Sequence, residues 1–469
     1  MFDASSGALV QKAKGDTNKI HDVCFSAQPG STQLATAGRK HLYFWDAKSG
    51  DKKKCLFGGN PMTSFSCVTY DADGICYTGG ANSKIYVWEG RNCRDTYDFH
   101  KKGFICSIRW VDGFLYSGGK DGCVNKIDTT SMTVLKTFEF NSLVRAVDCF
   151  ENRLIVGTRD GTIHSVCCDT DEREEIMHSH NEGEVWGLDH IPETAVITSG
   201  DDNQVIFWDF NNRRKFKSYE VSQRSVKAKR GGASTLSNYP DSKCSRAVAC
   251  NADWLAVAGN DGAVCIRSVG GDYAEHKLLE DSSEWIEVMA FSPDNKYLAV
   301  GSHDNLVYVY DASDDFSLVG KCKGHSSYIN CLDWSEDSTF IRTNCGAYEL
   351  LFFTIPDCNQ DPSGRSNTVA TVWATESVHF SWSTEGIYPK GTDGTHVNGV
   401  AANADRTIIS TGDDYGLVNL FRFPCRNGGI PRSYRGHSEH VVRVRFGEND
   451  QYLWSIGGYD QTLMQWKKC

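Results

Sequence analysis

The sequence has 469 residues and a formal net charge of -11 at pH 7, and this length suggests about two domains with separate cores. The negative balance argues against attraction of the whole surface to nucleic acid or anionic lipid, so an acidic partner would have to meet a local basic patch. No apolar run reaches the roughly 18 residues of a membrane span, and the N-terminus, MFDASSGALVQKAKG, lacks the apolar core of a signal peptide.

The cysteines favour a reducing compartment. There are 19 of them, but a high cysteine count predicts disulfides only in short secreted chains. Several cysteines here stand in apolar strands, where cysteine acts as a small hydrophobic residue. The sequence contains no Cys-x-x-Cys pair and no Cys/His cluster at zinc spacing. We therefore expect a cytoplasmic protein with no metal and no cofactor.

At its N-terminus the chain begins inside a repeat. Residues 2–7 (FDASSG) match residues 45–50 (WDAKSG), which we interpret as the end of a third strand and the turn that follows it. Residues 8–13 would then form an isolated outer strand, the only spare strand for the first half of the chain.

Ten repeats follow, each with a corner residue six positions before the end of its third strand. The corners lie mostly 39 to 46 residues apart, and two longer gaps mark insertions. Short alternating apolar runs and turns at this period are typical of WD-type β-propeller blades. Because one propeller usually has four to eight blades, the repeats predict an all-β protein with tandem WD40-type propellers and about ten blades in total. The corners are Arg39, Asn82, Asp121, Asp160, Asp202, Asp261, Asp304, Ala347, Asp414 and Asp460.

The fifth repeat carries the hydrogen-bond set expected inside such a blade. An Asp at the corner accepts from an imidazole, and the His and a Thr link on to an indole N–H. The last repeat offers His437, Asp460 and Trp466, with Ile456 where the hydroxyl is expected. A catalytic role is the competing interpretation, but recurrence at blade spacing favours structural clips. The full set in the fifth repeat is His180, Thr198, Asp202 and Trp208.

The first insertion, between about residues 212 and 242, is strongly basic. On an acidic protein such a loop is suited to an acidic protein surface or acidic protein tails, or to RNA phosphates. The alternative is a solvated loop without a partner. The basic residues are Arg213, Arg214, Lys215, Lys217, Arg224, Lys227, Lys229 and Arg230.

The second insertion, residues 356–396, places Trp373, Phe380 and Trp382 in an alternating apolar context. This pattern predicts an extra hairpin packed on its own blade. An exposed aromatic patch in this region would indicate a protein partner.

The final repeat, residues 436–466, predicts three strands and no fourth. Only Lys467, Lys468 and Cys469 follow it, so its outer edge would be open, and open edges are a liability in β-proteins. We predict that a strand near residues 173–178 pairs beside residues 461–467 and closes the second ring.

Three long segments carry a family resemblance: residues 302–334 (SHDNLVYVYDASDDFSLVGKCKGHSSYINCLDW), 386–398 (GIYPKGTDGTHVN) and 411–425 (TGDDYGLVNLFRFPC). They are similar to the C-terminal half of the echinoderm microtubule-associated protein-like family, as is the closing repeat. The resemblance implies two propellers in tandem, the first with seven blades and the second with six. Residues 179–469 would be the six-bladed ring, and residues 1–178 would be about four blades of an incomplete first ring.

The chain also departs from the family pattern. The coiled coil, basic region and hydrophobic motif that usually open family members are missing, so the first ring is about three blades short by this comparison. The chain would then be a fragment, an unusual four-blade half, or one part of a ring that another chain completes. Tyr388 and His396 stand where the family tends to have Trp and Asp, and the basic insertion replaces a short connection.

The resemblance implies a non-enzymatic cytoskeletal protein that binds tubulin or the microtubule lattice. Further partners would be cytoskeletal or axonemal proteins, in an axonemal or doublet assembly of a cilium or flagellum. No phosphate-loop, dinucleotide, zinc-protease or nucleophile-elbow motif is present, so we expect no catalysis, no small-molecule substrate and no membrane partner. Two other classes stay open: a general WD40 protein–protein scaffold unrelated to tubulin, and an RNA-associated propeller, which only the basic insertion favours.

Overall fold

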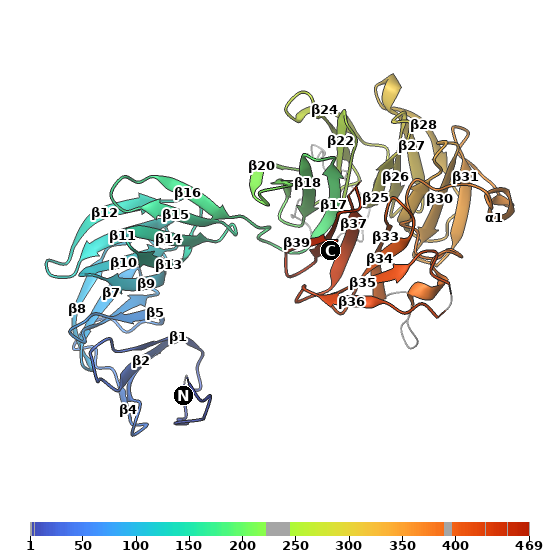
Figure 1. Cartoon of the computed structure of the whole chain (residues 1–469). Helices are drawn as coiled ribbons and strands as arrows, with labels where there is room; N and C mark the ends of the chain where they lie inside the picture. The colour runs from blue at the N-terminus through green and yellow to red at the C-terminus, as the bar shows by residue number, and fades with distance from the viewer. Residues whose placement is uncertain are drawn as a thin grey trace. The chain divides into compact units, whose positions relative to one another are not determined.

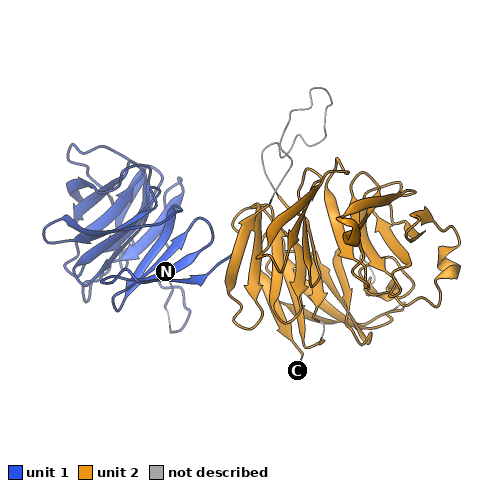
Figure 2. Cartoon of the chain, turned by 90° about the horizontal axis from the view of Figure 1, so that it is seen from above, with its two compact units in different colours: residues 1–179 blue, residues 180–469 orange. Residues whose placement is uncertain are grey.

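The computed structural model describes residues 2–3, 5–221, 244–388, 396–426, 428–447 and 449–468. Ten antiparallel sheets account for the strands in these ranges, nine with four strands and one with three. The chain divides into two compact units, residues 1–179 and residues 180–469 (Figures 1 and 2). The predicted all-β architecture of tandem propeller blades is confirmed, and the division falls one residue from the predicted boundary.

Unit 1 (residues 1–179) has four four-stranded sheets, one for each repeat. The first strand of each sheet packs on the first strand of the next, and the sheets form an open arc in Figure 1. Apolar side chains are exposed towards both ends of the arc, among them Phe25 in β1 and Phe150 in β13. The strands are β1 (Ile20–Phe25), β2 (Gln33–Gly38), β3 (His41–Asp46), β4 (Lys52–Lys54), β5 (Phe65–Tyr70), β6 (Cys76–Gly80), β7 (Lys84–Glu89), β8 (Asn92–Asp98), β9 (Ile105–Val111), β10 (Phe114–Gly119), β11 (Cys123–Asp128), β12 (Thr133–Glu139), β13 (Val144–Phe150), β14 (Arg153–Thr158), β15 (Ile163–Cys167) and β16 (Arg173–Met177).

Unit 2 (residues 180–469) has six sheets, which we call blades one to six in chain order. Its strands are β17 (Val185–Ile191), β18 (Ala195–Gly200), β19 (Gln204–Asp209), β20 (Lys215–Glu220), β21 (Ala247–Cys250), β22 (Trp254–Ala258), β23 (Val264–Ser268), β24 (Ala274–Leu279), β25 (Ile286–Phe291), β26 (Tyr297–Ser302), β27 (Val307–Asp311), β28 (Ser317–Cys322), β29 (Ile329–Trp334), β30 (Phe340–Cys345), β31 (Leu350–Thr354), β32 (Asn359–Gln360), β33 (Val397–Ala402), β34 (Ile408–Asp413), β35 (Leu417–Arg422), β36 (Arg432–Arg435), β37 (Val441–Phe446), β38 (Tyr452–Gly457) and β39 (Leu463–Lys467).

Blade-on-blade packing explains the composition of these strands. The second strands β18 (AVITSG) and β26 (YLAVGS) are buried at every residue, because neighbouring blades cover both faces of the sheet, and small or β-branched side chains suit that position. The ring of unit 2 closes where Val185 and Leu188 of blade one pack against Val442 and Trp454 of blade six. Arg443 strengthens this junction by donating to the Trp186 carbonyl at 2.9 Å.

The predicted strand exchange at the end of the chain is wrong. β16, which covers most of residues 173–178, pairs with β15 and completes the fourth sheet of unit 1. β39 pairs with β38, and no described strand lies on its outer side. The physical reason is locality: a short turn brings β16 beside β15, and closing a short loop costs little entropy. The predicted strand at residues 8–13 joins no sheet; the structure has only a bridge between Phe2 and Leu9.

In residues 356–388 and 396, the part of the second insertion that the structure describes, the predicted hairpin is also not found. This part contains β32, the short helix α1 (Gly364–Asn367), the 3-10 turn η2 (Glu385–Ile387) and a single bridge between Ser335 and Trp373. The first strands of neighbouring blades pack closely at the other five junctions of the ring. Between β29 and β33, residues 371–388 fill the junction: Ser377 donates to Asp333 of blade four, and Gly386 donates to the Cys425 carbonyl of blade five, each at 2.8 Å.

Helix is scarce in the described ranges. Apart from α1 and η2 there is one further 3-10 turn, η1 (Ala312–Asp314). None of these helices is long and apolar enough to cross a membrane.

Candidate functional site

The first strands of the six blades surround a central cavity of about 1000 Å³ in unit 2. All six blades and residues 374–380 of the second insertion contribute to its wall. Within a blade the first strand starts at one end of this cavity, and the antiparallel second strand returns to the same end. The corner between the second and third strands therefore lies beside the loop that leads into the first strand. We call this end of unit 2 the corner end.

Exposed tyrosines gather at the corner end. Tyr348, Tyr415 and Tyr459 stand at the corners of three consecutive blades and are 54%, 56% and 63% exposed. Tyr328, in the loop that enters blade four, is 40% exposed. We call these four residues the tyrosine rim.

Each rim tyrosine packs against the ring of a neighbouring histidine or phenylalanine side chain. Because these neighbours restrict the phenol rings, docking a partner on them would cost little side-chain entropy, and aromatic anchors of this kind are typical of protein interfaces. The pairs, with the separations of their ring centroids, are Tyr328–His303 (4.5 Å), Tyr348–Phe380 (5.0 Å), Tyr415–His396 (5.6 Å) and Tyr459–His440 (5.9 Å).

Near the rim, the carboxylate of Glu287 in β25 lies among three basic side chains. Burial opposes ionisation of Glu287, but the hydrogen bond from His303 and the two arginine charges outweigh it and lower its pKa. The guanidinium of Arg246 lies 4.0 Å from the Trp186 ring and 4.3 Å from the Trp285 ring, measured to the centroids. The ion-pair partners of Glu287 are His303 (3.1 Å), Arg246 (3.7 Å) and Arg443 (3.8 Å).

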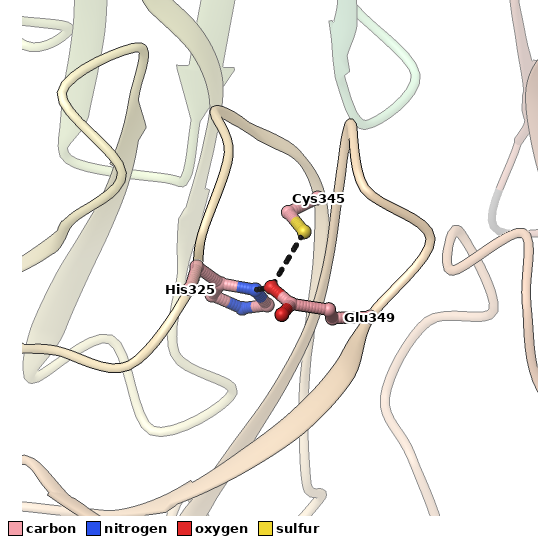
Figure 3. A group of neighbouring side chains, drawn as sticks. All are labelled: His325, Cys345 and Glu349. Atoms are coloured by element: carbon pink, nitrogen blue, oxygen red, sulfur yellow. Dashed lines mark hydrogen bonds and ion pairs between the residues drawn. The ribbon is translucent and has the colours of Figure 1, made fainter.

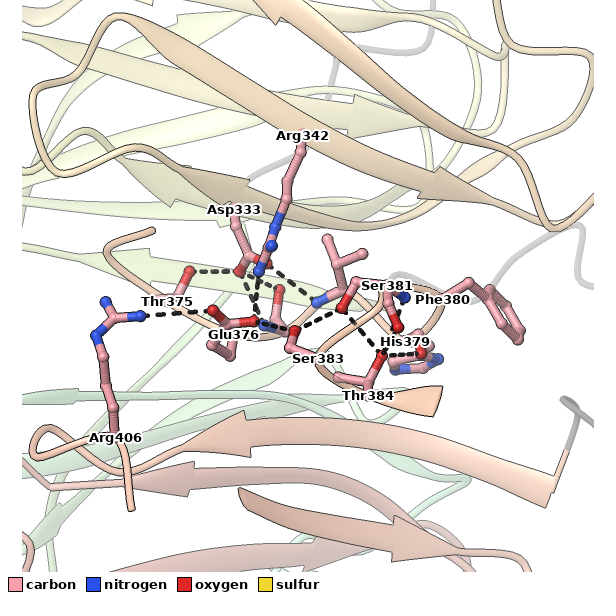
Figure 4. A network of polar contacts seen from close by, with 12 residues as sticks. Asp333, Arg342, Thr375, Glu376, His379, Phe380, Ser381, Ser383, Thr384 and Arg406 are labelled. Carbon is pink, nitrogen blue, oxygen red and sulfur yellow. Dashed lines mark hydrogen bonds and ion pairs between the residues drawn. The ribbon is translucent and has the colours of Figure 1, made fainter. Parts of the chain in front are cut away.

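Asp333 anchors the second insertion to blade four (Figure 4). Its side chain is fully buried, and Arg342 donates to one carboxylate oxygen from two nitrogens at 2.9 and 3.1 Å. The insertion supplies the remaining donors, which are Thr375 Oγ1 (2.5 Å), Ser377 N (2.8 Å), Ser377 Oγ (2.9 Å) and Val378 N (3.2 Å). A buried carboxylate is tolerated only when its oxygens are satisfied in this way.

The same network reaches blade five. Arg342 donates to Glu376 of the insertion at 2.6 Å, and Arg406 of blade five contacts the other Glu376 oxygen at 3.4 Å (Figure 4). Burial raises the pKa of Glu376, with Arg342 opposing the shift. The insertion therefore works as a polar wedge that joins blades four and five.

His379, next to this network, makes unit 2 sensitive to acid. Burial and the Arg443 charge lower its pKa to about 4. Because the unfolded chain takes up this proton near the ordinary value of about 6.5 and the folded chain does not, stability falls as the pH drops through this range. We expect a loss of about 2 kcal/mol between about pH 7 and pH 5 from this group. Urea unfolding of wild type and His379→Gln at pH 7 and pH 5 measures this loss. If the free energy of unfolding falls equally in both proteins, His379 is not its cause.

The clip residues of blade one meet as a set. His180 Nδ1 lies 2.9 Å from both Asp202 oxygens, its Nε2 lies 2.8 Å from Thr198 Oγ1, and the Trp208 indole donates to that hydroxyl at 2.8 Å. In neutral His180, Nδ1–H donates to the carboxylate and Nε2 accepts the threonine proton. Both ring nitrogens are thus engaged in structure, which argues against a catalytic role.

The clip of blade six corrects the predicted hydroxyl. His437 Nδ1 lies 3.2 Å from Asp460, and the hydroxyl of Ser455, not residue 456, lies 2.7 Å from His437 Nε2 and accepts from the Trp466 indole at 2.8 Å. The shift arises because this corner is one residue longer than that of blade one, so counting back from the aspartate misses the serine. Unit 1 contains a further clip that we did not predict from the sequence. In it, His100 contacts Asp121 and Ser117, each at 3.0 Å. Its spacing of 21 residues between His and Asp would have revealed it.

Removing the central hydroxyl of a clip is expected to be costly. Thr198→Val leaves the His180 Nε2 and the Trp208 indole without their buried partner, so we expect the free energy of unfolding to fall by about 2–3 kcal/mol. Thr194→Val is the matched control, because Thr194 is exposed, and a surface change of this kind should stay within about 0.5 kcal/mol. Urea unfolding measures both; equal effects would show that the clip hydroxyl adds nothing.

The basic insertion is only partly described. Arg213, Arg214, Lys215 and Lys217 lie in the turn before β20 and in that strand. Lys217 forms an ion pair with Asp272 of blade two, and its ammonium lies 4.9 Å from the centroid of Tyr273. Lys217 therefore helps to join two blades. The other predicted contacts, Arg224, Lys227, Lys229 and Arg230, lie outside the described residues.

Comparison with known proteins gives one family. The profile of the echinoderm microtubule-associated protein second β-propeller matches residues 185–468. The chain is 48% identical to the ciliary WD repeat-containing protein ctxp80 of Euplotoides octocarinatus, covering 100% of this chain and 66% of that protein. It is 32% identical to echinoderm microtubule-associated protein-like 1 of Rattus norvegicus (96% and 55%) and 31% identical to the 77 kDa echinoderm microtubule-associated protein of Lytechinus variegatus (92% and 64%). It thus spans about half to two thirds of the length of these relatives.

Proposed function

Since the chain belongs to the echinoderm microtubule-associated protein-like family, we propose that it is a non-enzymatic, microtubule-associated WD-repeat protein that binds tubulin or the microtubule lattice. Its place of action is the cytoskeleton of the cytoplasm. One relative is named a ciliary protein, which supports an axonemal or doublet assembly with other axonemal proteins as further partners.

The tyrosine rim is the observation that carries this proposal. Four tyrosines face solvent at one end of a closed six-bladed propeller. Each of them packs against the ring of a neighbouring histidine or phenylalanine side chain. Stiff blades hold such anchors at fixed distances from one another, which suits recognition of a rigid, repeating surface. We propose that the corner end of unit 2 meets the microtubule.

The basic segment 213–230, which includes the outer strand β20 of blade one, is a second contact in this proposal. Tubulin is acidic, whereas this chain carries a net charge of -11, so long-range repulsion has to be offset locally. The sequence of residues 213–230 is rich in positive charge, and Arg213 is exposed. Such a contact would weaken with added salt, because exposed charges are screened over about 10 Å at 0.1 M.

Co-sedimentation with stabilised microtubules tests the proposal. We expect the full chain to pellet with excess polymer and to saturate at a fixed ratio to tubulin. A chain that stays in the supernatant would overturn the tubulin proposal and favour a general protein–protein scaffold. The same assay with RNA in place of microtubules tests the remaining alternative.

Deleting residues 213–230 tests the basic contact. We expect the deletion variant to bind microtubules about 10-fold more weakly at low salt and to lose much of the salt dependence. Circular dichroism should first show that the ring is intact, because β20 lies within this segment. Unchanged affinity and unchanged salt dependence would remove the segment from the interface.

A further inference from the structure

Blade four of unit 2 contains an altered clip. Its His325 still contacts a buried hydroxyl, Thr343 Oγ1, at 2.6 Å. The corner aspartate is replaced by Ala347 and the aromatic partner by Phe353. The acid has moved two residues along the chain, to Glu349, whose longer side chain reaches back to His325 (Figure 3).

A thiol occupies the space that this change opens. Pairing with the first strand places Cys345 at the same register position as a glycine in other blades: Ile329 faces Cys345 as Ile105 faces Gly119 and Val441 faces Gly457. A Cβ at Gly119 would lie 2.7 Å from Asp121 Oδ1, and one at Gly457 would lie 2.6 Å from His437 Nδ1. A side chain at this position therefore points between the imidazole and the acid of the clip.

The three side chains form a compact triangle. Cys345 Sγ lies 3.1 Å from Glu349 Oε2, and His325 Nδ1 lies 3.4 Å from the same oxygen. All three donor atoms lie within 4.8 Å of one another. Zn–N and Zn–O bonds of about 2.0–2.2 Å at a tetrahedral angle separate their ligand atoms by about 3.4 Å. Two sides of the triangle, 3.1 and 3.4 Å, are close to this separation, and the third is at most 4.8 Å.

We propose that His325, Cys345 and Glu349 bind one divalent transition-metal ion of the zinc class. Imidazole, thiolate and carboxylate are all ligands that Zn²⁺ accepts, whereas Mg²⁺ and Ca²⁺ require oxygen donors. Binding releases the thiol proton, and the metal–sulfur bond takes the place of the thiol–carboxylate hydrogen bond. A water molecule or a partner's side chain would complete the tetrahedron.

Neighbouring groups already orient the ligands. Thr343 holds the far nitrogen of the imidazole, which fixes Nδ1 as the metal-binding atom. Ser326 donates from its backbone N–H to Glu349 Oε2 and from its hydroxyl to Oε1, each at 2.9 Å. Cys345 is fully buried, and the Glu349 side chain is 35% exposed, which gives an ion a route in.

The ion would do the work of the missing clip. His325 lies in the loop that enters blade four, Cys345 ends β30, and Glu349 immediately precedes β31. A metal joining them would tie the loop that enters blade four to the end of β30 and the start of β31, beside the His325–Thr343 contact that remains of the clip. The sequence alone does not reveal this site, because its ligands are spread over 25 residues with no Cys-x-x-Cys pair.

Cobalt titration of the 469-residue chain, purified under reducing conditions and stripped of metal, tests the site. One equivalent of Co²⁺ should produce a thiolate-to-cobalt charge-transfer band with tetrahedral d–d bands, and Zn²⁺ should abolish them by competition. Zn²⁺ should also raise the melting temperature of the chain. Absence of these bands at one equivalent would overturn the proposal.

Variants assign the signal among the 19 cysteines. Cys345→Gly restores the residue found at this position in other blades, so it should fold and lose the charge-transfer band. Glu349→Gln should retain the fold and bind Co²⁺ at least about 10-fold more weakly. Cys331→Ser, in the adjacent strand β29, is the matched control and should titrate as wild type. A band that survives in Cys345→Gly, or that disappears in Cys331→Ser, would overturn the assignment.

Discussion

Replacing Asp333 with alanine is expected to lower the free energy of unfolding by about 3–5 kcal/mol, the range seen when one partner of a buried ion pair is removed. Arg342 would keep its charge in a buried site with Glu376 as the remaining ion-pair partner. The insertion would lose the carboxylate that accepts from Thr375 and Ser377. The wedge between blades four and five should loosen as a result. Urea unfolding followed by tryptophan fluorescence measures the change.

Asp357→Ala is the matched control for this prediction. Asp357 lies on the same blade, but its side chain is exposed, so its removal should change stability by no more than about 0.5 kcal/mol. A loss below about 1 kcal/mol in Asp333→Ala would contradict the account of the insertion as a wedge held by this carboxylate.

A rim variant with Tyr348→Ser, Tyr415→Ser and Tyr459→Ser is expected to bind microtubules about 100-fold more weakly than wild type. Aromatic anchors at the centre of an interface commonly contribute 1 kcal/mol or more each, and about 3 kcal/mol corresponds to a factor of about 100. Because all three side chains are more than half exposed, the fold should be unaffected. Co-sedimentation over a range of tubulin concentrations measures the affinity.

The matched control changes two exposed apolar residues of the outer strand β28, Leu318 and Val319, to serine. Leu318 pairs with Tyr310, near the end of β27 that lies away from the corner, so binding should stay within about 2-fold of wild type. Equal losses in the two variants would show that the rim has no special part in binding.

Repeat spacing made much of the fold predictable. Corner residues recur at a blade's length, and each blade buries its strands against the next, so the period and the number of strands follow from local pattern. The expected division near residue 179 came from the family resemblance. The clip of blade one was equally accessible, because His180 and Asp202 stand at fixed offsets from Thr198 and Trp208.

Features that depend on competition between distant segments were not predictable in this way. Residues 173–178 could pair with the nearby strand β15 or with residues 461–467 at the end of the chain, and the structure pairs them with β15. The path of the second insertion depends on a buried carboxylate in β29 whose partners lie more than 40 residues away. The tyrosine rim combines loops from separate blades, so no single stretch of sequence reveals it.

Hydroxyl-radical footprinting of the chain on microtubules tests the central claim most directly, because it reports side-chain exposure residue by residue in the bound state. The account predicts that Tyr348, Tyr415 and Tyr459 lose reactivity when the chain is bound, while Leu318 of the outer strand β28 keeps it. Rim tyrosines that react as fast in the saturated complex as in the free chain would contradict it.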